Sequence, residues 1–173
     1  MDVDQFQNVL SKCERIVDGQ NLECIQDILV LKILNDIFEN ERQDIRQDFL
    51  LRGICSTEVD NLIDDPAYYQ FIYIPNLVRW QQLKNIQHND WTFIAHALQT
   101  IIDNNPINIP PLPHRAQNIN SYQMKQLVEL IDVCNFFQMS KEKTEAIFKV
   151  IESWKKMKRL KEGSWMLINC YYA

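Results

Sequence analysis

Histidine and cysteine are the residue types in this chain that could support catalysis or metal binding. The three histidines, His88, His96 and His114, fall in a predicted loop, a predicted helix and a proline-rich segment. None stands near another histidine or a cysteine at the spacing of metal ligands, and the five cysteines form no CxxC pair. The sequence therefore predicts no catalytic residue, no metal and no cofactor, although a cysteine-dependent hydrolase or transferase is kept as a minor alternative.

Two charged clusters could also carry chemistry. Asp64 and Asp65 could act as paired carboxylates, but adjacent side chains do not converge in regular structure, and Asp-Pro commonly opens a turn. A basic run at 155–161 could contact phosphate or serve as a nuclear-import signal. Cations at the C-terminus of a helix also complement its dipole, and this explanation is favoured. The run contains Lys155, Lys156, Lys158, Arg159 and Lys161.

Composition narrows the class of protein. The chain has 173 residues, of which 46% are hydrophobic and 24% charged, as in globular proteins with a buried core. A formal net charge of −5 argues against nucleic-acid binding, and no apolar run reaches the roughly 20 residues of a membrane span, so we expect neither nucleic acid nor a membrane as a partner. An odd number of unpaired cysteines indicates a reducing compartment, so we expect a cytoplasmic or nuclear protein.

Helical periodicity is clear in four segments. Apolar residues recur at helical spacing in each of them, and Asp18-Gly19 ends the first. We expect Asn120 or Ser121 to cap the third. The four predicted helices cover residues 3–17, 91–102, 121–137 and 146–160.

Three segments lack such a clear pattern. Residues 28–41 fit either a β-hairpin or a helix, since a short apolar run does not distinguish the two. Residues 68–74 are aromatic and β-prone. A strap at 105–119 contains prolines that prevent helix formation, so we expect an extended surface segment there. The tail from Glu162 is apolar, and packing on its own domain is favoured over packing on a partner.

Taken in order, these parts resemble the BTB/POZ superfamily, and within it the Skp-type and Elongin C adaptors. LVLKIL and DIFENERQDI stand where that fold has its hairpin, the strap takes the place of the proline-containing spacer, and ELIDVCNFFQM looks like the helix that follows. The resemblance covers roughly residues 26–155. It implies an α+β, helix-rich fold, to which residues 1–20 add an N-terminal amphipathic helix before a single adaptor-like domain at 21–173.

The resemblance also implies a function. The chain would be a non-enzymatic adaptor in a ubiquitin ligase complex, bridging a cullin-type scaffold to a substrate receptor. The cullin-facing pair maps onto Asn135 and Phe136. The receptor-facing set maps onto Ile147, Val150, Ile151, Trp154 and, in the tail, Trp165.

One alternative for the fold stays open. If residues 24–39 form a helix instead of a hairpin, the chain is an all-α scaffold or regulatory binding module of the armadillo or HEAT type. The scarcity of glycine, with three residues in the chain, favours that alternative.

Overall fold

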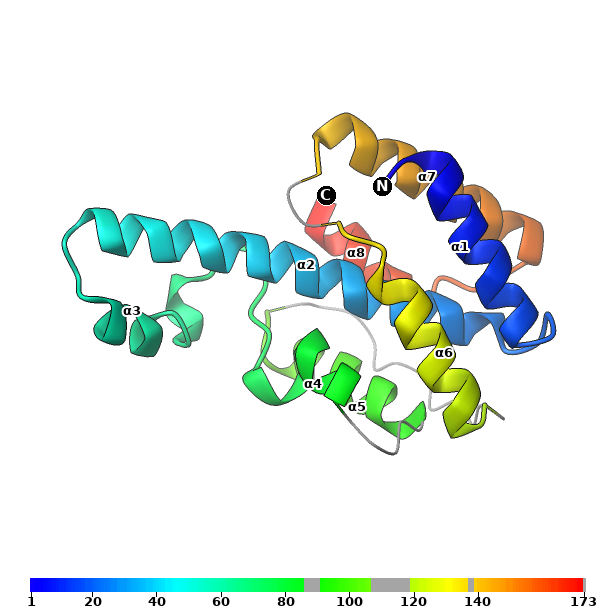
Figure 1. The fold of residues 1–173 in the computed structure, drawn as a ribbon, viewed down its shortest axis with the longest axis horizontal. Helices are drawn as coiled ribbons and strands as arrows, with labels where there is room; N and C mark the ends of the chain where they lie inside the picture. Colours follow the sequence, from blue (N-terminus) through cyan, green and yellow to red (C-terminus); the bar gives the residue numbers. More distant parts are fainter. Residues whose placement is uncertain (86–90, 107–118, 137–138, 173) are drawn as a thin grey trace.

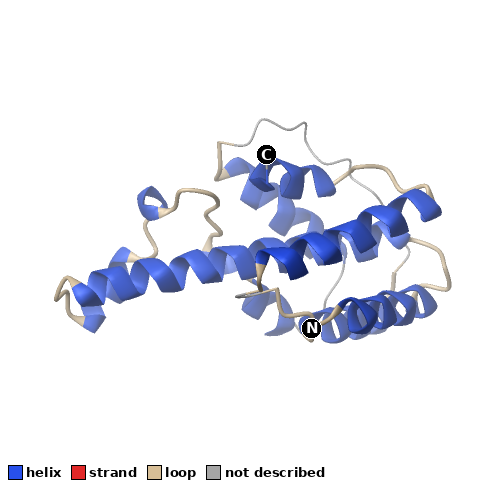
Figure 2. Ribbon diagram, turned by 90° about the horizontal axis from the view of Figure 1, so that it is seen from above, coloured by secondary structure: helices blue, strands red, loops and turns tan. Residues whose placement is uncertain are grey.

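Helix α2, Leu22–Leu51, runs the length of the molecule, and the other helices pack around it (Figures 1 and 2). The computed structural model describes residues 1–85, 91–106, 119–136 and 139–172; within these ranges it contains helices and no strand. Within them, too, every helix is too short or too polar to span a lipid bilayer. The other helices are α1 (Val3–Ile16), α3 (Ser56–Leu62), α4 (Trp80–Asn85), α5 (Trp91–Asp103), α6 (Ser121–Asp132), α7 (Lys141–Lys158) and α8 (Trp165–Tyr172), with short 3-10 turns η1 (Pro66–Tyr68) and η2 (Asn76–Val78).

The first half of α2 is the centre of the core. Every residue from Cys24 to Asp36 is buried, because α1, α4, α5, α6 and α8 contact this part of the helix from different sides. A helix buried on all faces has no amphipathic stripe, because none of its faces is turned to water. The hairpin that the resemblance implies at 28–41 is wrong, because these residues lie inside α2. The described residues form helices and contain no strand, as the all-α alternative predicts, whereas its armadillo or HEAT type stays a prediction.

The four helices predicted from periodicity are all present. Helix α1 ends where Asp18 and Gly19 adopt positive φ angles of 51° and 67°, and it packs on α6 and α7. Its Phe6, Leu10 and Cys13 belong to the same hydrophobic cluster as the buried residues of α2. Helix α6 is shorter than predicted, since it ends at Asp132. The division of the chain at residue 20 stays a prediction.

Residues 69–74, part of the β-prone segment, follow an irregular path and form no strand. Side chains bind the backbone groups that a neighbouring strand would otherwise bind. Asn105 accepts a hydrogen bond from the Tyr73 amide at 2.7 Å and donates one to the Tyr73 carbonyl at 2.8 Å. Glu41 accepts one from the Gln70 amide at 2.7 Å. Residues 107–118 of the predicted strap lie outside the described residues.

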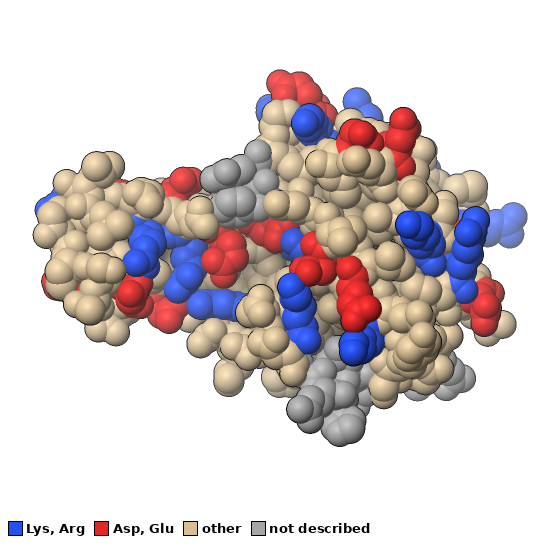
Figure 3. Space-filling view, in the orientation of Figure 1, with Lys and Arg blue, Asp and Glu red and all other residues tan. Residues whose placement is uncertain are grey.

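The second half of α2 leaves the body and forms an arm with α3 and the chain that returns to the body, residues 39–71 (Figure 1). Phe49, Val59 and Ile63 form a small apolar cluster separate from the main core. Ion pairs hold the arm together and to the body: Arg46 pairs with Asp60, and Arg79 with Asp64 at 2.8 Å. Acidic and basic side chains alternate where the arm meets the body (Figure 3).

The C-terminal tail packs on its own chain, as predicted. Trp165, Leu167 and Ile168 of α8 are buried in the main cluster, and α8 contacts α2. Gln26 of α2 donates a hydrogen bond to the Glu162 carbonyl at 2.7 Å, just before α8 begins. The tail is thus tied to the central helix by both apolar and polar contacts.

Asn120 caps α6, and its removal should have a measurable cost. Its side chain accepts a hydrogen bond from the Gln123 amide at 2.9 Å, and the Gln123 side chain accepts one from the Asn120 amide. We expect Asn120→Ala to lower the free energy of unfolding by about 1 kcal/mol in urea denaturation. Ser121→Ala, one residue inside the helix, is the control and should change it by less than about 0.5 kcal/mol. Equal losses for the two variants would contradict the capping role.

Candidate functional site

A buried polar centre lies on α2, in the middle of the apolar core. Lys32 is 5% exposed and donates hydrogen bonds to both carboxylate oxygens of Asp36 at 2.5 Å. Asp36 also accepts a hydrogen bond from the Phe136 amide at 2.8 Å. Burial raises the pKa of Asp36, and the neighbouring Lys32 ammonium opposes that rise. The pair is an intrahelical i,i+4 ion pair that also binds the chain just after α6.

Trp80 extends this centre to α6. The Trp80 amide donates to Asn35 Oδ1 at 2.7 Å, and its indole Nε1 donates to Asp132 Oδ1 at 2.7 Å. Lys84 pairs with the other oxygen of Asp132 at 2.7 Å. Although burial alone raises the pKa of Asp132, these hydrogen bonds and charges lower it overall. The polar groups link α2, α4 and α6, so their arrangement is that of a structural network.

The spacing of two charged residues in the sequence marks the polar centre, although that centre was not predicted. In ILVLKILND, a lysine and an aspartate stand four residues apart inside an otherwise apolar run. Charged residues are almost never buried unless they are paired. That spacing would have indicated a buried helix with an internal ion pair, and it argues against a hairpin.

The three buried cysteines differ in their protonation from the exposed Cys55. Burial raises the pKa of the Cys13 and Cys134 thiols to about 12 and that of Cys24 well above its usual range, so all three are protonated at neutral pH. A hydrogen bond with Thr57 lowers the pKa of the exposed Cys55 thiol. The described residues contain no cluster of three potential metal ligands. His96 is exposed on α5, whereas His88 and His114 lie outside the described residues.

The residues predicted to bind partners differ in how far they are exposed to solvent. Asn135 is exposed, while Phe136 is half-buried with its ring 6.1 Å from that of Phe6. Both follow the end of α6 and do not lie within it. Val150 is half-buried on α7. The remaining four are buried in the main cluster: Ile147, Ile151, Trp154 and Trp165. Partner binding by this set stays a prediction.

The basic run lies at the C-terminal end of α7, where cations complement the helix dipole. Lys155 is buried and pairs with Glu152 and Glu162 at 3.1 and 3.0 Å. Lys158 pairs with Glu14 of α1 at 2.7 Å. Part of the run therefore holds α7 and the chain before α8 in place.

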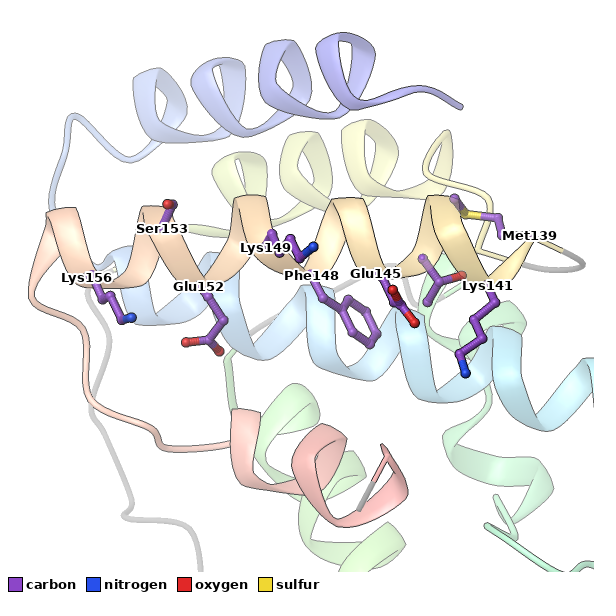
Figure 4. A pocket seen from close by; sticks show the side chains of 9 residues that line it. Met139, Lys141, Glu145, Phe148, Lys149, Glu152, Ser153 and Lys156 are labelled. Carbon is purple, nitrogen blue, oxygen red and sulfur yellow. The ribbon is translucent and has the colours of Figure 1, made fainter.

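Two of the grooves on the described surface are lined by both apolar and charged side chains. One, of about 940 Å³, follows the outer face of α7 and is lined by both lysines and glutamates around Phe148, which makes an edge-to-face contact with Trp165 (Figure 4). The other, of about 450 Å³, lies on the arm. It runs between one face of α2 and the returning residues 68–71. Both grooves combine apolar side chains with charged ones, which is typical of a binding surface.

A family model for the HsdM N-terminal domain matches residues 2–161. The chain belongs to this family. The match includes α1 through α7, so the long α2 and its arm are part of the HsdM N-terminal domain. No curated protein and no solved structure matches the chain.

The HsdM N-terminal domain belongs to the methyltransferase subunit of type I restriction-modification systems. The predicted BTB/POZ, Skp and Elongin C resemblance is therefore wrong. The ubiquitin-ligase role and the cullin partner are wrong with it. The resemblance was built on the order of apolar segments around the strap. Its most specific part was ELIDVCNFFQM, whose apolar residues have the spacing of any amphipathic helix. Such spacing carries little information about which family a chain belongs to.

Proposed function

We propose that this chain is a non-catalytic assembly domain of a type I restriction-modification methyltransferase. The observation that carries the proposal is the family match over residues 2–161. The chemistry of the described residues supports it. The buried cysteines are protonated, and the buried charges at Lys32 and Asp36 join helices together. The partners are then the other subunits of the restriction-modification system, and the compartment is the bacterial cytoplasm, not a nucleus.

Complementation tests this role. A methyltransferase complex from which the domain has been deleted should fail to assemble, and this chain, supplied as a separate polypeptide, should restore a complex of defined mass in size-exclusion chromatography. The chain alone should transfer no methyl group to DNA. Methyl transfer by the chain alone would refute the non-catalytic role, and a deleted complex that assembles normally would refute the assembly role.

A further inference from the structure

Apolar side chains line the groove on the arm. Ile45 and Phe49 of α2 line it, and the ring of Tyr68 meets Phe49 edge to face with centroids 5.0 Å apart. Phe71 also lines it and is 59% exposed. Leu51, 86% exposed, lies near the end of the same helix. Large apolar side chains gathered at a groove are typical of a protein-binding surface.

The rim of the groove is acidic. Glu41, Asp44 and Asp48 follow one another at intervals of three and four residues, so they share one face of α2. Arg52 also lines the groove and pairs with Asp48 at 2.6 Å, so the three carboxylates and one guanidinium of the lining leave a net charge of −2. Residues 39–65 contain eight acidic and three basic residues. Their net charge is therefore −5, the same as the net charge of the whole chain. The rim therefore attracts positively charged groups.

The arm presents this groove in a fixed position. Phe38, where α2 leaves the body, packs on Tyr69 with ring centroids 4.9 Å apart, and the Arg79 guanidinium lies 4.9 Å from the Phe38 ring. Arg79 in turn binds Asp64 on the returning chain. A partner would therefore meet a preformed surface, and little ordering entropy would be lost on binding.

From these features we infer that the arm groove binds a basic amphipathic helix of another subunit of the complex. The leucine-type side chains of that helix would contact the exposed rings of Tyr68 and Phe71, and its lysines or arginines would face the acidic rim. This inference rests on the proposed function, which supplies the subunit. Nucleic acid is disfavoured as the occupant because its phosphates would meet the same carboxylates.

A second copy of the chain is the other occupant to consider. Its basic run at 155–161 has the complementary charge, but Lys155 is buried and Lys158 is already paired with Glu14. Figure 3 shows Lys and Arg side chains at the end of the body opposite the arm. Such contacts could repeat head to tail or close as a two-fold dimer, and in either case the chain would self-associate through the arm. The two cations named above are buried or already paired, so a separate basic helix is the better match for the groove.

A synthetic peptide tests the groove directly on the full chain. The probe is a helical peptide of about 20 residues with leucines on one face and arginines beside them. Two comparison ligands are used: a peptide in which glutamates replace the arginines, and a DNA duplex. Amide chemical shifts should change at residues 41–52 and 68–71 with the arginine peptide. Shift changes confined to α7, equal binding of the glutamate peptide, binding of the duplex at the arm, or concentration-dependent self-association through the arm would each overturn the proposal.

Charge reversal supplies the matched variants. Asp44→Lys with Asp48→Lys should weaken binding of the arginine peptide about tenfold or more. Asp103→Lys with Glu129→Lys changes the net charge equally at exposed sites away from the arm and should leave binding nearly unchanged. Circular dichroism should show all variants folded. Equal binding by the two double variants would refute the role of the rim.

The same variants separate this proposal from the proposed function. If the unaltered chain restores the methyltransferase complex and the Asp44→Lys, Asp48→Lys variant restores it equally well, the arm proposal fails and the assembly role stands. If the unaltered chain does not restore the complex, the assembly role fails, and with it the identity of the partner subunit.

Discussion

Replacing Lys32 with methionine should lower the free energy of unfolding by about 3–5 kcal/mol near neutral pH, because the change leaves the Asp36 carboxylate buried without its counter-charge. Lys32 donates to both oxygens of Asp36, and its ammonium lies 5.7 Å from the centre of the Trp80 ring. Methionine keeps the length and apolar character of the side chain. The loss should therefore come from the unpaired carboxylate and not from an empty space. Urea denaturation of the full chain gives the value.

The pH dependence of this variant distinguishes the charge from packing. Burial raises the pKa of Asp36 in the folded chain above its value in the unfolded chain. Protonated Asp36 therefore stabilises the folded chain. This contribution to the free energy of unfolding is fully present below the pKa of Asp36 in the unfolded chain, and it is lost as the pH rises through the pKa of Asp36 in the folded chain. Removal of Lys32 raises the folded pKa further, so protonation relieves the variant. The cost of Lys32→Met should then be smaller at about pH 5 than at about pH 8.

Lys125 provides the control for this experiment. It forms an i,i+4 ion pair with Glu129 at 3.9 Å on the exposed face of α6. Lys125→Met should change stability by less than about 0.5 kcal/mol, since exposed pairs contribute little. If Lys32→Met were as mild as Lys125→Met, or if its cost did not depend on pH, the buried pair would not have the role described.

Replacing Trp165 with alanine should have an effect of similar size, about 3–5 kcal/mol. Trp165 is 2% exposed, its ring meets Phe148 edge to face at 5.6 Å, and the buried Lys155 ammonium lies 5.0 Å from its centre. The alanine variant loses these contacts and leaves a cavity between α7 and α8. Thermal and urea denaturation should both show the loss.

This variant also tests the earlier expectation that Trp165 binds a partner. Met157, 71% exposed on α7, is the matched control, and Met157→Ala should stay within about 0.5 kcal/mol of the unaltered chain. If Trp165→Ala unfolds at the same urea concentration as Met157→Ala but fails to restore the methyltransferase complex, Trp165 acts in an interface. A large loss of stability, in contrast, places its main role in the core.

The amphipathic helices were predictable from the sequence because each has one face in water. In α1, α5 and α7 the polar residues alternate with apolar ones at the helical period, and Asn120 marked the start of α6. The first half of α2 has no such pattern, because all its faces are buried. A continuous apolar run then looks the same whether it is helix or strand.

The irregular path of residues 69–74 and the arm depend on contacts that no local pattern encodes. Asn105 binds the backbone of Tyr73 across 32 positions of sequence, so the β-prone composition of that segment was misleading. The arm groove combines a face of α2 with residues 68–71, and its charge appears only when both are brought together. The predicted partner-binding residues follow from the adaptor resemblance and lie after α6, on α7 and in the tail, away from the arm.

The unbroken course of α2 from the core into the arm makes the orientation of the groove depend on the number of residues at the junction. The helix has 30 residues, so at about 1.5 Å per residue it is a rod of about 45 Å. One residue inserted near Phe38 would turn everything beyond it by about 100° around the helix axis and move it by about 1.5 Å. The acidic rim would then face another direction although no side chain in it had changed. Relatives that bind a partner through this acidic rim should therefore have the same number of α2 residues between the core and the arm.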